Sequence, residues 1–75
     1  MKVSSVLPFY KQINTNEYRL KKGYTLLLGG DSFNFYRDDG DNVTFYEFEF
    51  NLTVSKSSDF QYDVQLLYRG KSVNI

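Results

Sequence analysis

Cysteine, histidine, tryptophan and alanine are all absent from this 75-residue chain, and proline occurs once. Without cysteine there is no disulfide framework and no thiolate nucleophile, and without histidine there is no imidazole base. The usual nitrogen and sulfur ligands of zinc and haem are missing as well. These absences remove most catalytic machinery, so the sequence predicts a protein that is not an enzyme and has no cofactor and no metal centre.

Net charge and long apolar runs are lacking too. Nine basic and nine acidic side chains give a formal net charge of zero, which opposes a surface that tracks nucleic-acid phosphates. The longest apolar run, Leu26–Leu28, is far shorter than the roughly 18–20 residues that cross a bilayer. Residues 1–8 do not contain the about 7–15 apolar residues of a secretory signal. We therefore expect cytoplasmic synthesis and no membrane partner.

The chain is rich in aromatic residues instead. Seven phenylalanines and seven tyrosines make up 19% of it. Disordered segments are poor in aromatic residues and carry high net charge, and this chain shows neither property. We expect a single small domain with a thin core and a radius of gyration of about 11 Å.

Composition divides this domain into an N-terminal arm at residues 1–23 and an antiparallel β domain at residues 24–75. In the arm, Ser5 is placed to cap a short helical turn with Pro8 in its first turn, where a missing amide is tolerated. Residues 14–16 end this turn, and residues 18–21 alternate as a short strand.

The β domain is predicted from four segments. Tyr24–Leu28 is a short apolar run between glycines, and Ser32–Tyr36 alternates apolar and polar residues. Val43–Val54 alternates over twelve residues, with apolar side chains at the even positions from Tyr46 onward. Phe60–Tyr68 repeats the even pattern. The predicted fold class is all-β, a small antiparallel sheet or meander that is curled or closes into a partial barrel.

Two hairpins follow from this reading. A loop at residues 55–59 would pair the last two segments with Leu52 opposite Tyr62, Phe50 opposite Val64, Phe48 opposite Leu66 and Tyr46 opposite Tyr68. A symmetric loop at residues 38–42 would place Phe33, Phe35 and Phe45 on the face of the sheet opposite to the one that carries these apolar pairs. Either a bulge changes the parity there, or these three rings form an exposed patch, which would be a contact surface.

Charge is distributed unevenly along the chain. Residues 1–30 carry five basic and one acidic side chain, whereas residues 31–75 carry four basic and eight acidic ones. The two halves either neutralise each other within the fold or dock onto neighbouring copies or a partner. The candidate interface residues are Pro8, Phe9, Tyr10, Ile13, Arg19, Lys21, Lys22, Phe33, Phe35 and Phe45.

Acidic side chains gather in the second half and form a candidate acidic face. A chain of this kind could act as a small phage-type inhibitor that binds a host protein through that face. The turn at residues 38–42 lacks the spacing of a calcium-binding EF-hand loop, and a carboxylate pair on a flat sheet face lacks the pocket that acid–base catalysis needs. The acidic face consists of Asp38, Asp39, Asp41, Glu47 and Glu49.

Aromatic residues also stand beside basic ones, at residues 18–19, 21–24 and 68–71. Bases stack on such rings in OB-like modules that bind single-stranded nucleic acid, so this is a further alternative. Zero net charge and the acidic second half weigh against it.

The segment Val6–Ile13, followed by Tyr18 and Arg19, resembles the N-terminal anchoring segments of some bacteriophage tail-associated proteins. The resemblance covers about twenty residues and contains no catalytic motif. It implies a structural role in a virion, in which the arm with Pro8, Phe9 and Tyr10 docks onto a neighbouring subunit. We therefore expect a non-enzymatic structural or assembly subunit that contacts other protein subunits in a homo-oligomer or a larger assembly.

Overall fold

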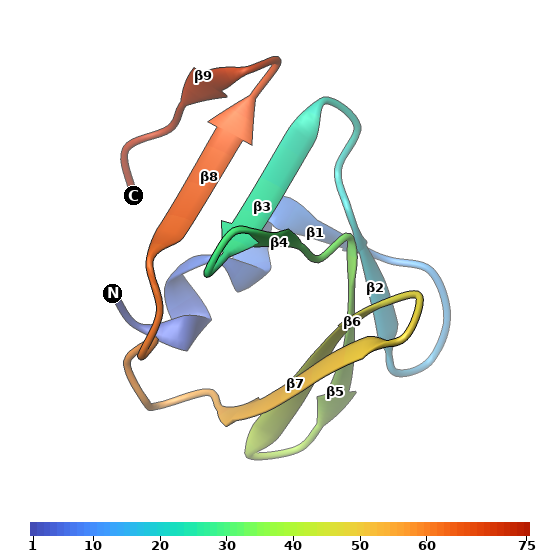
Figure 1. Ribbon diagram of the computed structural model, residues 1–75. Coiled ribbons are helices and arrows are strands. Elements are labelled where there is room, and N and C mark those ends of the chain that lie inside the picture. Colours follow the sequence, from blue (N-terminus) through green and yellow to red (C-terminus); the bar gives the residue numbers. More distant parts are fainter.

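Two antiparallel sheets and two short 3-10 turns make up the protein, and the all-β prediction is confirmed (Figure 1). The computed structural model describes residues 1–75, and its radius of gyration is 11.3 Å. The elements, in chain order, are η1 (Val3–Ser5), η2 (Leu7–Phe9), β1 (Tyr10–Gln12), β2 (Glu17–Leu20), β3 (Tyr24–Leu28), β4 (Asp31–Ser32), β5 (Phe35–Asp39), β6 (Asn42–Glu47), β7 (Phe50–Ser55), β8 (Val64–Tyr68) and β9 (Lys71–Ser72).

The larger sheet has the strand order β1-β2-β5-β6-β7, and the smaller one has the order β4-β3-β8-β9. In the larger sheet Tyr36 lies opposite Phe45, and Phe45 lies opposite Leu52. In the smaller sheet Leu26 lies opposite Leu66. These pairs of apolar side chains form the inner faces of the two sheets, since successive residues of a strand point to opposite faces.

One apolar core holds the fold together, and the arm contributes to it. Val3 and Val6 from the 3-10 turns are fully buried, as are Leu26, Val43 and Phe45. The predicted short helical turn is present, with Pro8 in the first turn of η2. The remaining buried members of the core are Tyr10, Leu20, Leu28, Phe33, Tyr36, Phe60 and Leu66.

The role expected for Ser5 is wrong. Ser5 lies inside η1, and Val6 is the residue that precedes η2, with no side-chain cap at either turn. The Val6 N–H donates instead to the Val3 carbonyl, so the backbone closes the turn. Val6 occupies the place between the two turns because its side chain is completely buried in the core.

The single long strand expected at Val43–Val54 is also wrong. β6 ends at Glu47, Phe48 and Glu49 form a two-residue turn, and β7 runs back along β6. A straight strand of twelve residues would span about 40 Å, whereas the longest axis of the molecule is 31 Å. The fold-back places Val43 opposite Val54, and both contact the core.

The expected pairing of Phe60–Tyr68 with residues 43–54 is wrong for the same reason. β7 already pairs with β6, and β8 pairs with β3 along its whole length. β3 is an apolar run, and in its pairing with β8 the apolar Leu26 lies opposite the apolar Leu66. Phe60 lies before β8 and is buried against Phe45, with a ring-centroid distance of 5.9 Å.

The first hairpin has a shorter loop than expected. Asp39 lies opposite Asn42, so only two residues connect β5 to β6, and the register moves by one residue. Phe45 consequently points into the core and is fully buried, and Phe33 is buried as well. The exposed patch of three phenylalanine rings therefore does not form, because only Phe35 lies on the outer side of the sheet, opposite Tyr46.

Candidate functional site

The larger sheet has an inner face against the core and an outer face that carries most of its charged side chains. One row of the outer face crosses all five strands. It starts at Lys11 on β1 and passes through Arg19 and Phe35 to Tyr46 and Asn51 on β7. We call the side of the sheet that carries this row the outer face.

Two aromatic rings and a guanidinium group pack along this row. The Phe35 and Tyr46 rings are stacked with centroids 5.4 Å apart and an interplanar angle of 13°. The Arg19 guanidinium carbon lies 5.7 Å from the Phe35 ring centroid, which is within range of a cation–π interaction. Phe35 is thus flanked by β2 on one side and by β6 on the other.

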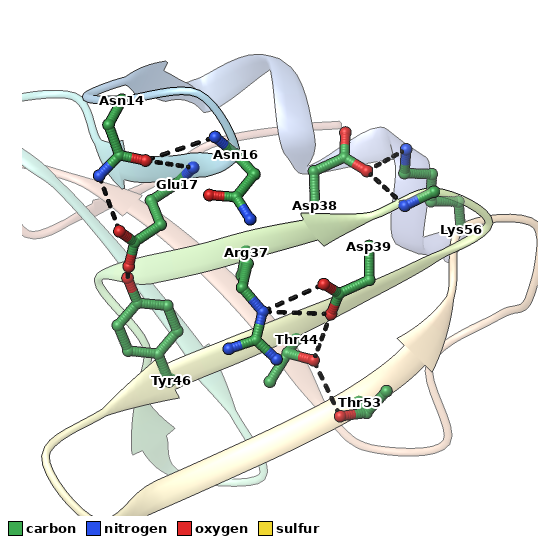
Figure 2. A network of polar contacts seen from close by, with 11 residues as sticks. Asn14, Asn16, Glu17, Arg37, Asp38, Asp39, Thr44, Tyr46, Thr53 and Lys56 are labelled. Carbon is green, nitrogen blue, oxygen red and sulfur yellow. Dashed lines mark hydrogen bonds and ion pairs between the residues drawn. The ribbon is translucent and has the colours of Figure 1, made fainter.

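Polar contacts continue from this row to the loop between β1 and β2 (Figure 2). The Tyr46 hydroxyl donates to the Glu17 carboxylate, and the Asn14 side-chain amide donates to the same carboxylate at 2.7 Å. These hydrogen bonds lower the pKa of Glu17. Burial, together with the Glu17 hydrogen bond, raises the pKa of Tyr46 to about 12.

A second set of contacts lies toward the β5–β6 turn (Figure 2). Asp39 accepts from Arg37 at 3.1 Å and from the Thr44 hydroxyl at 3.2 Å. Asp38 accepts from Lys56 at 2.8 Å and from the Gly40 N–H at 3.0 Å. The hydrogen bond from Arg37 lowers the pKa of Asp39, and the one from Lys56 lowers that of Asp38.

The five residues predicted to form an acidic face are not brought together. Asp38 and Asp39 pair with cations of the same chain, and Glu47 accepts from the Asn34 N–H at 2.9 Å. Asp41 and Glu49 are exposed, but they lie in the turns at opposite ends of β6. No three acidic side chains converge in a way that could hold a metal ion.

Basic side chains, in contrast, do converge. A solvent-open hollow of about 640 Å³ lies where β1 and β2 meet the turn before β3. Four cations line it and no acidic residue does, and the two ion pairs of the molecule, Arg37–Asp39 and Lys56–Asp38, lie elsewhere. We call it the basic hollow, and its lining residues are Lys11, Ile13, Arg19, Leu20, Lys21, Lys22, Gly23, Tyr24 and Asn34.

Four of the predicted interface residues therefore share one surface, namely Ile13, Arg19, Lys21 and Lys22. Lys11 and Tyr24 also line the hollow, although the list of candidate interface residues does not include them. Lys11 reaches the hollow only because β1 pairs with β2 and places it opposite Arg19. The spacing of residues along the chain does not indicate that pairing.

The remaining arm residues of the predicted interface, Pro8, Phe9 and Tyr10, have other surroundings. Tyr10 is buried in the core, where its hydroxyl donates to the Phe33 carbonyl at 2.7 Å and burial raises its pKa. Phe9 is half-buried against Tyr24, with a ring-centroid distance of 5.4 Å. Pro8 is exposed.

Comparison with family models, with curated proteins and with solved structures finds no match. None of the helical segments of the chain could span a membrane.

Proposed function

We propose that this protein is a non-enzymatic structural or assembly subunit that binds other protein subunits through its basic hollow. The observation that supports this most directly is the gathering of Lys11, Arg19, Lys21 and Lys22 around one hollow without an acidic partner. Such a surface attracts carboxylates, because the potentials of like charges add within a concave site. The proposed partner surface is acidic.

The sheet register supports a binding role for these cations. Lys11 and Arg19 lie directly opposite each other on neighbouring strands. Like charges in this arrangement destabilise a sheet. The Arg19 guanidinium contacts the Phe35 ring, but neither cation has an acidic partner within the chain, and a binding partner that supplies the missing negative charge would explain this arrangement.

The rings near the hollow favour a protein partner over a single-stranded nucleic acid. Tyr24 is the aromatic residue that lines the hollow, and it packs on Phe9 and on Tyr68, with a centroid distance of 4.7 Å to the latter. Base stacking needs a free ring face.

The other alternative, an inhibitor that binds through an acidic face, is less well supported because the carboxylates of that face are dispersed.

The resemblance of Val6–Ile13 to phage tail-associated anchors suggests a virion as the assembly in question. Within that resemblance, Val6 and Tyr10 belong to the core of this chain. The docking surface is accordingly assigned to the basic hollow, which the later residues of the arm line, and not to Pro8, Phe9 and Tyr10.

The experiment that tests this proposal is an NMR titration of the folded chain with poly-L-glutamate and, separately, with an oligothymidine strand. We expect poly-L-glutamate to shift the amide signals of the residues that line the hollow. Lys21→Glu should weaken this binding, whereas Lys71→Glu, which makes the same charge change at an exposed residue of β9 outside the hollow, should not. Stronger binding of the oligothymidine strand at the same residues would favour the nucleic-acid alternative, and no shift at the hollow with either probe would contradict both.

A further inference from the structure

A second, smaller hollow, lined by one acidic and no basic residue, lies at the β7 edge of the larger sheet. It has a volume of about 230 Å³, and Phe50 and Tyr62 stand on its rim with 58% and 51% of their surface exposed. Asp31 also lines it, and the neighbouring turn carries Phe48 and Glu49. Neither Asp31 nor Glu49 has an ion-pair partner. We call the group Asp31, Phe48, Glu49, Phe50 and Tyr62 the acidic corner.

Phe48 is the most unusual member of the acidic corner. It is 94% exposed, and its backbone has a φ of 51°. A bulky residue in this left-handed region costs conformational energy. An apolar ring that is both strained and exposed stabilises nothing within its own chain, whereas a ring at the tip of a hairpin is well placed to insert into a partner.

The basic hollow and the acidic corner lie at opposite edges of the larger sheet, the hollow at β1 and β2 and the corner at the start of β7. Asn34 lines the basic hollow, and the preceding residue, Phe33, lines the second hollow. The Asn34 N–H donates to Glu47, the last residue before the Phe48–Glu49 turn. Lys21 follows directly after the end of β2, so this part of the basic hollow and the Phe48–Glu49 turn lie toward the same end of the strands of the larger sheet.

We propose that the partner of the basic hollow is a second copy of this chain, bound about a twofold axis. The acidic corner of each copy would fill the basic hollow of the other. Two patches of opposite charge, one at each edge of a sheet, meet in complementary pairs when a second copy is turned by half a rotation. This inference rests on the proposed function, for which it names the partner.

The properties of the two surfaces match. The lysines of the hollow would face the carboxylates of the partner's acidic corner, and Ile13, which is half exposed, would give Phe48 an apolar contact. The formal charge of the whole chain is zero, so two copies have no net repulsion to overcome. A twofold contact closes on itself, and the expected product is a discrete dimer and not a filament.

The test is the molar mass of the purified chain by light scattering across protein concentration, at low and at high salt. We expect a monomer–dimer equilibrium that weakens in high salt, because salt screens exposed charges. Lys21→Glu with Lys22→Glu, and separately Glu49→Lys, should each weaken the dimer about tenfold or more. Lys71→Glu is the matched control and should leave the dimer unchanged.

Mixing the two charge variants gives the most decisive measurement. In a homodimer of either variant alone, like charges would face each other in both contacts. Mixed, the glutamates at positions 21 and 22 of one variant meet the lysine at position 49 of the other, and the second contact keeps its native charges. We therefore expect a heterodimer to form from two variants that are monomeric by themselves. Near-ultraviolet circular dichroism of each variant checks that it remains folded.

The other outcomes overturn the proposal. A wild-type monomer at all concentrations, a mixture that stays monomeric, or a mass that rises without limit would each exclude the twofold dimer. If poly-L-glutamate still shifts the signals of the basic hollow in that case, the proposed function stands and the partner is a different acidic protein. If poly-L-glutamate leaves the hollow unchanged, the proposed function itself fails.

Discussion

The Tyr46 hydroxyl on β6 donates a hydrogen bond to the Glu17 carboxylate on β2, so these two side chains reach across β5, the strand between them. Asn14 donates to the same carboxylate, and the Asn14 side-chain oxygen accepts from the Asn16 and Glu17 N–H groups. The loop between β1 and β2 is thereby tied to the centre of the sheet. Since β1 and β2 carry Lys11 and Arg19, this tie also fixes the position of the basic hollow.

Tyr46→Phe should loosen this tie without disturbing the ring stack on Phe35. We expect a loss of about 1 kcal/mol in the free energy of unfolding, the usual net value of one hydrogen bond. Denaturant unfolding measures it. Glu17→Gln, which keeps an acceptor, should cost less than Glu17→Ala. Equal stability of Tyr46→Phe and the wild type would show that the hydroxyl bond contributes nothing.

Three tyrosines should make the fold sensitive to alkali. Burial raises the pKa of Tyr36 to about 12, and burial together with the Glu17 hydrogen bond does the same for Tyr46, from an ordinary value of 10.0. Burial raises that of Tyr10 also. The unfolded chain loses these protons first, so their contribution to stability is complete below pH 10 and disappears as the pH rises toward 12.

The measurement is a pair of alkaline titrations, one of tyrosinate absorbance and one of circular dichroism. We expect part of the tyrosine absorbance to appear only together with loss of the folded signal. Tyr36→Phe should remove a portion of that late absorbance. Titration of all seven tyrosines before any unfolding would contradict the raised pKa values.

Two phenylalanines of the same hairpin should respond to substitution in opposite ways. Phe45 is fully buried and lies within 6.0 Å, between ring centroids, of Tyr10, Tyr36 and Phe60. Phe45→Ala should cost about 3–5 kcal/mol, which is a large part of the about 5–15 kcal/mol that stabilises a typical domain. Phe45→Leu, which keeps most of the volume, should cost less.

Phe48→Gly should instead raise the free energy of unfolding, by up to about 1 kcal/mol, because glycine adopts a positive φ without strain. The measurement is denaturant unfolding at low protein concentration, where the chain is monomeric. The same variant should weaken the proposed dimer. Lower stability of Phe48→Gly under these conditions would show that the exposed ring contributes to the fold of its own chain.

The turn at Phe48 and Glu49 also shows which parts of this fold can be predicted from sequence. Alternation of apolar and polar residues predicted strands and the all-β class, because the pattern reflects burial on one face of a sheet. The turn at Phe48 and Glu49 contains no glycine, proline or asparagine, so the alternation continues through it and reads as one strand. Once that turn was missed, the partners of β7 and β8 were misassigned together.

The candidate site was predictable to the extent that its residues are neighbours in sequence. Lys21 and Lys22 stand side by side, and Arg19 is close to them. Lys11 and Asn34 join the basic hollow only through the pairing of β1 with β2 and the contact of Leu20 with Asn34. Such long-range pairings depend on how loops close, which the pattern of a single strand does not reveal.

Gly23 forms the turn between β2 and β3 at the edge of the basic hollow. Substitution of this residue measures how closely the chain is packed there. Its φ is 90°, and a Cβ atom at this position would lie 2.9 Å from Cε1 of Tyr68. Gly30 has the same φ but open space around it. Both Gly23→Ala and Gly30→Ala should therefore lose about 1–2 kcal/mol of stability through backbone strain, and Gly23→Ala should lose more because the Tyr68 ring must move away from Tyr24. A double-mutant cycle with Tyr68→Ala isolates this excess, which should vanish when the ring is absent. If Gly23→Ala costs no more than Gly30→Ala in the presence of Tyr68, the ring yields freely and the packing of Tyr68 on Tyr24 does not hold this edge of the hollow in place.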